Sequence, residues 1–285
     1  MRVALLGTGL MGYPMALRLL RTGHALTVYN RSSKKAAPLR KEGARVVRLA
    51  FEAVREAQCV VLMLADAKAI NQCLFGRNVS LVGKTIIQMG TISSTESTAI
   101  AARVRKHKGE YFECPVLGSR READEGRLFL MAGATPRQFK KWRKFLKCFG
   151  PQPQLIGPVG KAAALKLALN QLIASLISSF ALSLGFVQRQ GVKVEDFMGI
   201  LRQSVLYAPT FDKKLPGMLA RDYRNPNFST RHMLKDVNLF LREAKRKRLA
   251  TQTLQGVQRI LAQTVRQGFK NHDYCSLFDI ISPKG

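Results

Sequence analysis

Short apolar runs alternate with helical segments through the first half of the chain, and this alternation constrains the fold more than any other feature. Strands that alternate with helices form βαβ units, which assemble into a mostly parallel sheet. We therefore expect an α/β domain. The runs that we expect to be strands are RVALLG (2–7), ALTVYNR (25–31), ARVV (44–47), CVVLMLA (59–65), TIIQMG (85–90), YFECPVLG (111–118) and LFLMAGA (128–134).

Strand signals end near residue 160, and long helical patterns follow. The stretch FGPQPQLIGPVG (149–160) separates the two regions, because proline and glycine interrupt regular structure. A chain of 285 residues, of which 46% are hydrophobic, can bury the cores of two modest domains. We predict an α/β domain over residues 1–158 and a helical domain over residues 159–285.

The segment from Leu167 to Val187 contains 21 residues without a charged side chain, which is long enough to cross a bilayer. It also holds Asn170, Gln171 and four serines, and it follows an α/β half with no other hydrophobic span. A helix that is apolar on all sides equally suits a large core or the interior of a dimer. We interpret the segment as a central helix that protein buries on most sides.

The formal net charge of +29 is compatible with a nucleic-acid-binding surface. The basic residues are nevertheless spread along the whole chain, and we find no helix-turn-helix punctuation or RNA-binding aromatic motif. A dense basic run at 137–147 carries apolar residues at helical spacing, which predicts a core-facing stripe with a solvated basic back. That stripe comprises Phe139, Trp142, Leu146 and Phe149.

The cysteines are scattered without any close paired spacing, so neither a disulfide framework nor a zinc site is expected. We predict reduced, mostly buried thiols and no metal. The first residues, MRVALLGTGLMG, are typical of a strand that enters a glycine turn and not of a cleaved apolar leader, so we expect a cytoplasmic protein. The five cysteines are Cys59, Cys73, Cys114, Cys148 and Cys275.

The turn GTGLMG follows the first expected strand and opens a helix. Gly7, Gly9 and Gly12 have the G-x-G-x-x-G spacing of dinucleotide-binding turns, with Leu10 and Met11 between them. Glycine allows a tight turn, a close approach of the backbone to pyrophosphate, and close packing of helix on strand. The pyrophosphate then lies at the helix N-terminus. We predict that these residues bind a dinucleotide.

The second expected strand ends in YNRSSKK, where an NAD-binding protein would place a carboxylate for the ribose 2′-hydroxyl. Asn30 is neutral, whereas Arg31, Ser32 and Ser33 offer a guanidinium and two hydroxyls that suit a 2′-phosphate. We therefore predict NADP(H). The alternative is a solvated basic turn. Leu64 and Asp66 follow a later strand of the same sheet, where loops that line the cofactor are expected.

Lys166 lies within the apolar run GKAAALKLALNQL (160–172). A buried ammonium without a partner is costly, because desolvation disfavours the charged form. Either the side chain reaches the surface from a helix end, or another group compensates its charge.

Four sequence blocks resemble the β-hydroxyacid dehydrogenase family, which includes 3-hydroxyisobutyrate dehydrogenases and the glyoxylate and succinic semialdehyde reductases. They are GTGLMGYPMA (7–16), FECPVLGSRREADEGRLFLMAGA (112–134), GPVGKAAALKLALN (157–170) and HMLKDVNLFL (232–241). The resemblance implies an N-terminal Rossmann domain, a long interdomain helix over 159–188 and an all-α C-terminal domain for substrate binding and dimerisation. It also implies a homodimer or homotetramer.

In this resemblance Lys166 falls on the family's catalytic lysine, and Asn170 falls on the asparagine four residues later. Both side chains then lie on one face of a helix and can meet one substrate oxygen. The oxyanion of the substrate would compensate the buried charge. The implied reaction is hydride transfer between NADP(H) and a small carbonyl or β-hydroxyacid compound, with Lys166 as general acid and base.

Other positions carry over from the same resemblance. Thr91 matches a threonine near the nicotinamide, with an ordinary helix cap as the alternative. Lys235 matches the lysine of a Lys-Asp block that closes over the cofactor, and Asp236 orients it; the alternative is a surface ion pair. Phe211 and Phe228 fall in the stretch that lines the substrate pocket, although core packing suits them equally.

The substrate loop departs from the family pattern. Leu117 stands where the family usually has a serine that contacts the substrate carboxylate, while Gly118 and Ser119 remain. Backbone N–H groups of this turn can still hold a carboxylate. The following SRREADEG run resembles the small-aldehyde reductases more than the 3-hydroxyisobutyrate enzymes. The alternatives are an imine reductase, although such relatives typically lack the lysine, and a cofactor-binding module associated with nucleic acid.

Overall fold

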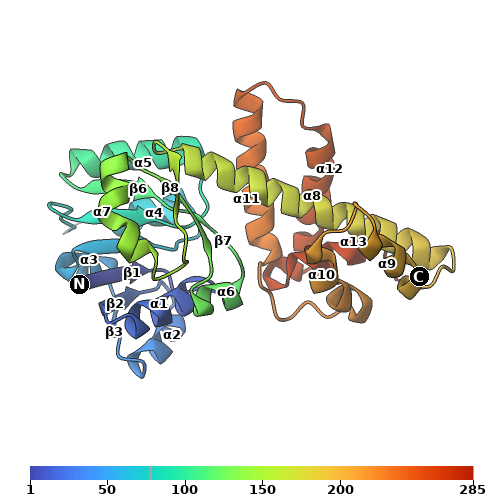
Figure 1. Cartoon of the computed structure of the whole chain (residues 1–285), viewed down its shortest axis with the longest axis horizontal. Helices are drawn as coiled ribbons and strands as arrows, with labels where there is room; N and C mark the ends of the chain where they lie inside the picture. The colour runs from blue at the N-terminus through green and yellow to red at the C-terminus, as the bar shows by residue number, and fades with distance from the viewer. Residues whose placement is uncertain (77–78, 285) are drawn as a thin grey trace. The chain divides into compact units, whose positions relative to one another are not determined.

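The computed structural model describes residues 1–76 and 79–284. The chain divides into two compact units, Met1–Leu167 and Ala168–Gly285, and Figure 1 shows a sheet with helices in the first and helices in the second. The helix α8 (Lys161–Arg189) begins in the first unit and continues into the second.

The first unit contains, among the described residues, a nine-stranded sheet with strand order β3-β2-β1-β4-β5-β6-β8-β7, and β9 pairs with β8. The strands from β3 to β6 are parallel, and β8 is antiparallel to β6. The order 3-2-1-4-5-6 is that of a Rossmann fold, in which ligands bind at the carboxyl ends of the strands where the order reverses. The bounds are β1 (Arg2–Leu6), β2 (Ala25–Tyr29), β3 (Arg45–Val47), β4 (Cys59–Leu62), β5 (Thr85–Gln88), β6 (Glu110–Glu113), β7 (Val116–Leu117), β8 (Phe129–Gly133) and β9 (Gln154–Gly157).

Helices cover both faces of this sheet. Side chains of β1 alternate between two cores, because successive residues of a strand point to opposite faces. Val3 and Leu5 belong to one core, and Ala4 and Leu6 belong to the other. The first core includes α1 (Gly12–Arg21), α2 (Ser33–Ala36), η1 (Ala37–Arg40), α6 (Arg120–Glu125) and α7 (Pro136–Leu146), and the second includes α3 (Ala50–Glu56), α4 (Ala67–Leu74) and α5 (Ser94–Lys106).

Two details differ from the sequence prediction. The expected strand 111–118 is divided into β6 and β7 at Pro115, which has no N–H to donate to a sheet. The boundary stretch 149–160 contains a further strand, β9, which pairs with β8 in parallel. The predicted apolar stripe of α7 is confirmed, because Trp142 and Leu146 are buried in the first core.

The second unit is built of helices and the loops between them, and its described residues form one isolated β-bridge, between Ser229 and Asp273, and no strand. Its core is formed by one face of α8 and by the helices that follow it, with Phe180, Leu184, Met218 and Met233 among the buried side chains. The predicted fold class is therefore confirmed. The later elements are α9 (Val194–Gln203), α10 (Pro209–Ala220), α11 (Thr230–Arg246), α12 (Gln252–Arg266), η2 (Phe269–Asn271), η3 (Tyr274–Leu277) and α13 (Phe278–Ile281).

Helix α8 is long and apolar enough, by length and composition, to cross a membrane, and a core helix of a soluble protein meets the same criteria. Its most apolar 18-residue window is 44% buried. The expectation that protein buries this helix on most sides is thus not met within one chain. Its exposed apolar residues share one face, at helical positions that span about a third of a turn. They are Leu172, Leu176, Leu182 and Phe186.

Candidate active site

The glycine-rich turn lies between β1 and α1, and its three glycines meet different physical demands. Gly7 has a φ of +102°, and a Cβ there would lie 2.2 Å from the carbonyl oxygen of Met63. A Cβ on Gly12 would lie 1.8 Å from the carbonyl oxygen of Gly7. A Cβ on Gly9 would have no neighbour within 4 Å. Gly9 therefore borders open space at the N-terminal end of α1, where dinucleotide-binding folds hold pyrophosphate.

Hydrogen bonds tie this turn to the end of β2. The N–H of Gly7 donates to the carbonyl oxygen of Tyr29 at 2.8 Å, and the N–H of Thr8 donates to Asn30 Oδ1 at 3.0 Å. Asn30 Nδ2 donates to the carbonyl oxygen of Ser32 at 2.9 Å. The amide of Asn30 thus joins the two loops that we expect to hold the cofactor, a role that the sequence did not reveal.

Thr8 is a second residue that sequence reasoning missed. Its Oγ1 is buried and has no hydrogen-bond partner among the described residues. Buried hydroxyls are nearly always hydrogen-bonded, so an orphaned one in a ligand-binding turn is a contact that a bound cofactor would satisfy. Thr8 occupies the variable position x of the G-x-G pattern, which any residue type can fill, so the pattern did not mark it as a binding residue.

Arg31 and Ser32 are exposed after β2. The guanidinium of Arg31 forms no hydrogen bond or ion pair with any residue that the structure describes, so its donors are available to a ligand. A fork of donors of this kind matches the oxygens of a phosphate. The residues present therefore fit an NADP(H) that carries a 2′-phosphate.

Leu64 and Asp66 follow β4 at the same edge of the sheet. Leu64 is partly buried beside the turn, and its Cδ2 would lie 3.2 Å from a Cβ on Gly7. Asp66 caps α4, since its Oδ1 accepts a hydrogen bond from the N–H of Ala69 at 2.8 Å. The carboxylate of Asp66 is thus used by the helix, whereas Leu64 borders the predicted cofactor site.

Thr91 lies after β5, two residues before the residue that caps α5. That cap is Ser93, whose Oγ accepts a hydrogen bond from the N–H of Glu96 at 3.1 Å. The alternative interpretation of Thr91 as a helix cap is therefore wrong. Its proximity to the nicotinamide stays a prediction.

The substrate loop runs from β7 into α6. Leu117 is partly buried in β7, and Gly118 has a φ of +142°, at which a Cβ would lie 2.7 Å from Leu128 Cδ2. The N–H of Ser119 donates to Glu122 Oε2 at 2.7 Å, and its hydroxyl also contacts that carboxylate. Ser119 is thus engaged as the cap of α6, so its hydroxyl replaces the missing serine of position 117 only if this cap opens.

Lys166 is buried in α8, with a relative exposure of 8%. The alternative that its side chain reaches the surface is therefore wrong for this chain. Asn170 follows one turn later on the same helix and is 2% exposed. Residues four positions apart lie on one face of a helix, so both polar groups emerge from the same side of α8.

Asn170 belongs to a buried polar network in the second unit. Its Nδ2 donates to Asp236 Oδ2 at 2.7 Å, and Lys235 Nζ lies 2.7 Å from Asp236 Oδ1. Asp236 is 3% exposed, so the alternative of an ordinary surface ion pair is wrong. Because a carboxylate only accepts, it fixes the orientation of the Asn170 amide. Asn170 Oδ1 is buried and has no hydrogen-bond partner among the described residues.

Phe211 and Phe228 pack within the second unit. Phe211 is 5% exposed and stacks on Phe180, with ring centroids 4.6 Å apart. Phe228 is partly buried and meets Tyr274 edge-on. The structure thus places both in core packing, which is the alternative that the sequence left open.

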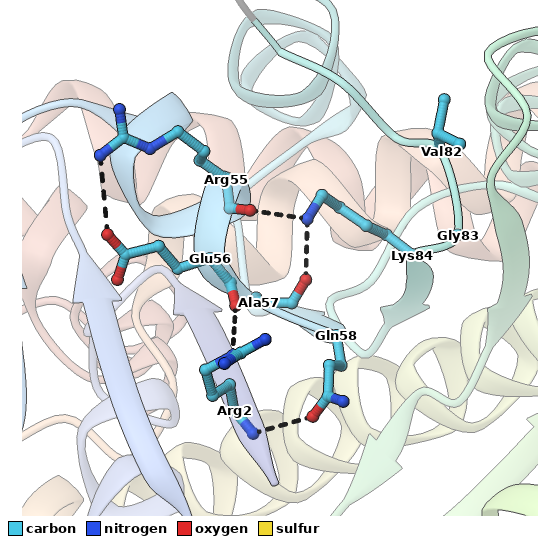
Figure 2. Close-up of a pocket in the computed structure, with 8 residues that line it drawn as sticks. All are labelled: Arg2, Arg55, Glu56, Ala57, Gln58, Val82, Gly83 and Lys84. Carbon is cyan, nitrogen blue, oxygen red and sulfur yellow. Dashed lines mark hydrogen bonds and ion pairs between the residues drawn. The ribbon is translucent and has the colours of Figure 1, made fainter.

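A pocket of 480 Å³ at the opposite edge of the sheet contains none of the predicted site residues. Figure 2 shows that its cations are used internally: Lys84 Nζ donates to the carbonyl oxygens of Arg55 and Ala57, each at 2.9 Å. Arg2 Nε donates to the carbonyl oxygen of Glu56 at 3.0 Å. These contacts satisfy the last carbonyls of α3, so the pocket is structural.

Two family models match the chain and show the protein family to which it belongs. A family model described as the NAD binding domain of 6-phosphogluconate dehydrogenase matches residues 2–157. A second, described as the NAD-binding of NADP-dependent 3-hydroxyisobutyrate dehydrogenase, matches residues 160–281. The chain belongs to the β-hydroxyacid dehydrogenase family. Members of this family are NAD(P)-dependent oxidoreductases, so this chain is an enzyme of that class with a nicotinamide cofactor and a small-molecule substrate.

Curated relatives include glyoxylate/succinic semialdehyde reductase 2, chloroplastic, of Arabidopsis thaliana, which is 28% identical over 284 residues, 98% of this chain and 79% of that protein. Cytokine-like nuclear factor N-PAC of Drosophila melanogaster is 26% identical over 96% of this chain, which spans 46% of that protein. Among solved structures, Mycobacterium tuberculosis 3-hydroxyisobutyrate dehydrogenase with L-serine has a TM-score of 0.86 at 22% identity, covering 98% of both chains. An imine reductase from Myxococcus stipitatus has a TM-score of 0.68 at 20% identity, covering 97% of this chain and 98% of its own.

Proposed function

We propose that this β-hydroxyacid dehydrogenase is an NADPH-dependent reductase of a small carbonyl compound, with Lys166 as general acid. The observation that carries the proposal is the burial of Lys166 on α8, one turn before Asn170. The oxygen of a reacting carbonyl becomes negatively charged, and a buried ammonium stabilises that charge more strongly than an exposed one would.

Lys166 and Asn170 have different roles in the proposed reaction. When bound, NADPH supplies the hydride. Lys166 stabilises the negative charge that develops on the carbonyl oxygen and donates its proton to that oxygen, and in the oxidative direction the neutral amine accepts the proton. Asn170 has one N–H committed to Asp236, which leaves its second N–H to donate to the substrate oxygen and orient it.

Cofactor choice is the first testable consequence. We expect the wild-type enzyme to prefer NADPH over NADH in kcat/KM, because the free guanidinium of Arg31 can pair with the 2′-phosphate. Arg31→Ala should narrow that preference about 10- to 100-fold, as the loss of a charge-assisted hydrogen bond predicts. Steady-state kinetics with both cofactors measures the change. Arg105→Ala removes an equal charge from the exposed end of α5 and serves as the control; a wild-type preference for NADH would contradict the assignment.

The substrate that we favour is an aldehyde or keto acid that carries a carboxylate. Its support is the similarity to two Arabidopsis glyoxylate/succinic semialdehyde reductases, at 28% and 29% identity. An NADPH-oxidation screen over glyoxylate, succinic semialdehyde, methylglyoxal, tartronate semialdehyde and a cyclic imine tests the proposal. Turnover of the imine alone would favour an imine reductase.

A homo-oligomer is the assembly that we expect, because the apolar face of α8 formed by Leu172, Leu176, Leu182 and Phe186 is exposed in one chain. Light scattering after size exclusion should give at least twice the mass of the 31.8 kDa chain. Phe186→Glu should lower that mass, because it places a charge in an apolar contact. Val205→Glu, at an exposed apolar residue outside α8, should not change it. A wild-type monomer would contradict the expectation.

The second candidate is a cofactor-binding module associated with nucleic acid. Its support is the net charge of +29 and the similarity to N-PAC, whose name describes a nuclear factor. The same screen separates the two functions. If the protein binds NADPH but no carbonyl compound in the screen causes NADPH oxidation, the result would favour the second candidate.

A further inference from the structure

Glu113, the last residue of β6, is a buried carboxylate at the start of the helix that carries Lys166. It is 1% exposed. Its Oε1 accepts hydrogen bonds from the N–H of Gly160 at 2.8 Å and from the N–H of Ala163 at 2.9 Å. Gly160 directly precedes α8, and Ala163 lies in its first turn. Glu113 therefore holds the beginning of α8 from the sheet.

This contact replaces an ordinary helix cap. The first N–H groups of a helix lack intrahelical partners, and a side chain of the residue before the helix usually accepts one of them. Gly160 has no side chain, and its φ of +99° is one that other residues rarely adopt. Glu113 supplies the missing acceptor, and its negative charge suits the positive end of the helix dipole.

The surrounding residues leave room for the carboxylate and orient it. Glu113 is the strand partner of Gly133 in β8. A Cβ on Gly133 would lie 2.5 Å from Glu113 Oε1, so only glycine leaves room for the carboxylate there. The hydroxyl of Ser97 in α5 donates to the other carboxylate oxygen. Tyr111 Oη lies 2.8 Å from Ser97 Oγ, and it must be the donor, since Ser97 has one hydrogen. The start of α8 and Ser97 of α5 thus hold the two carboxylate oxygens, and Gly133 of β8 leaves room for them.

No cation compensates this carboxylate: among the described residues, none forms an ion pair with it. Burial raises the pKa of Glu113 above the ordinary 4.5, while the hydrogen bonds from Ser97 and from the first amides of α8 lower it. A buried acid that is supported only by amides and a hydroxyl is costly to the fold. Such a cost is typical of a group retained for precise placement.

We propose that Glu113 is a positioning residue for Lys166. The proposal rests on the function proposed above for that lysine. Lys166 is three residues beyond Ala163, so the amides that meet Glu113 set the rotation of the turn from which the lysine projects. Holding this turn on β6 fixes the Lys166 ammonium relative to the edge of the sheet at which we expect the cofactor.

The test compares Glu113→Ala with Glu113→Gln, which keeps one acceptor oxygen and the side-chain volume. Glu110→Gln, the same change at the exposed start of β6, is the matched control. We expect Glu113→Ala to lower kcat about 10²-fold, since a misplacement of about 1 Å can cost that much. Glu113→Gln should lower kcat less, and neither should change the KM for NADPH, because the glycine-rich turn does not contact Glu113.

Hydrogen exchange gives a readout that does not depend on catalysis. The amides of Gly160 and Ala163 should exchange about 10-fold faster or more in Glu113→Ala, because exchange reports local opening. Unchanged exchange in a folded Glu113→Ala protein would overturn the proposal, as would faster exchange with wild-type kcat. If Glu113→Ala does not fold, a Glu113→Gln protein with wild-type kcat also overturns it. Failure of the function proposed for Lys166 would be seen in a different experiment, because the Lys166→Met protein would then keep wild-type activity.

Discussion

We expect the Lys166→Met protein to reduce its best carbonyl substrate about 10²- to 10⁴-fold more slowly than wild type, the range for loss of a general acid. Methionine keeps the length and the apolar stem of lysine and removes the charge. Stabilisation of the developing alkoxide and donation of the proton are then both lost. Stopped-flow or steady-state measurement of NADPH oxidation gives kcat directly.

The variant should remain folded and should bind NADPH like wild type. Methionine keeps the packing of the lysine stem, and it removes the desolvation penalty of the ammonium together with the contacts that the ammonium makes, so we expect the protein to stay folded. Asn170→Ala should lose less activity, because its amide orients the substrate oxygen and transfers no proton. Wild-type kcat in Lys166→Met would refute the assignment of Lys166, and unfolding of that variant would assign the lysine to a structural ion pair.

The Gly9→Ala protein should fold normally and bind NADPH about 10-fold or more weakly, a loss that corresponds to about 1.4 kcal/mol. A Cβ on Gly9 meets no protein atom within 4 Å, so stability has no reason to change. The methyl group would instead occupy the space in which the pyrophosphate approaches the backbone. Fluorescence titration with NADPH and thermal unfolding of the free protein separate these two effects.

Two other glycines serve as comparisons for Gly9. Gly12→Ala should destabilise the free protein as well, since its Cβ would lie 1.8 Å from a backbone oxygen. Gly256→Ala adds a methyl group in open space on α12 and should leave NADPH binding unchanged. Equal NADPH affinity in wild type and Gly9→Ala would show that the cofactor does not approach this glycine.

Local signals in the sequence were sufficient for the α/β half. Alternating apolar runs, the glycine turn and the apolar stripe of α7 each depend on contacts between neighbours in the chain, and the structure has them where the pattern predicted. The errors are also local in origin. Pro115 divides a run that composition alone joins, and β9 lies in a stretch whose proline and glycine content is typical of a linker.

The sequence by itself determined the fold class, the family and the residues that form the glycine turn and the apolar helix around Lys166, because periodicity and spacing are properties of the chain. The tertiary structure alone decided which polar groups meet. Asn30 bonds to Thr8 across 22 residues, and Glu113 reaches the start of α8 across 47. Such pairs follow from which strand ends lie together at one edge of a sheet, and no local pattern records that.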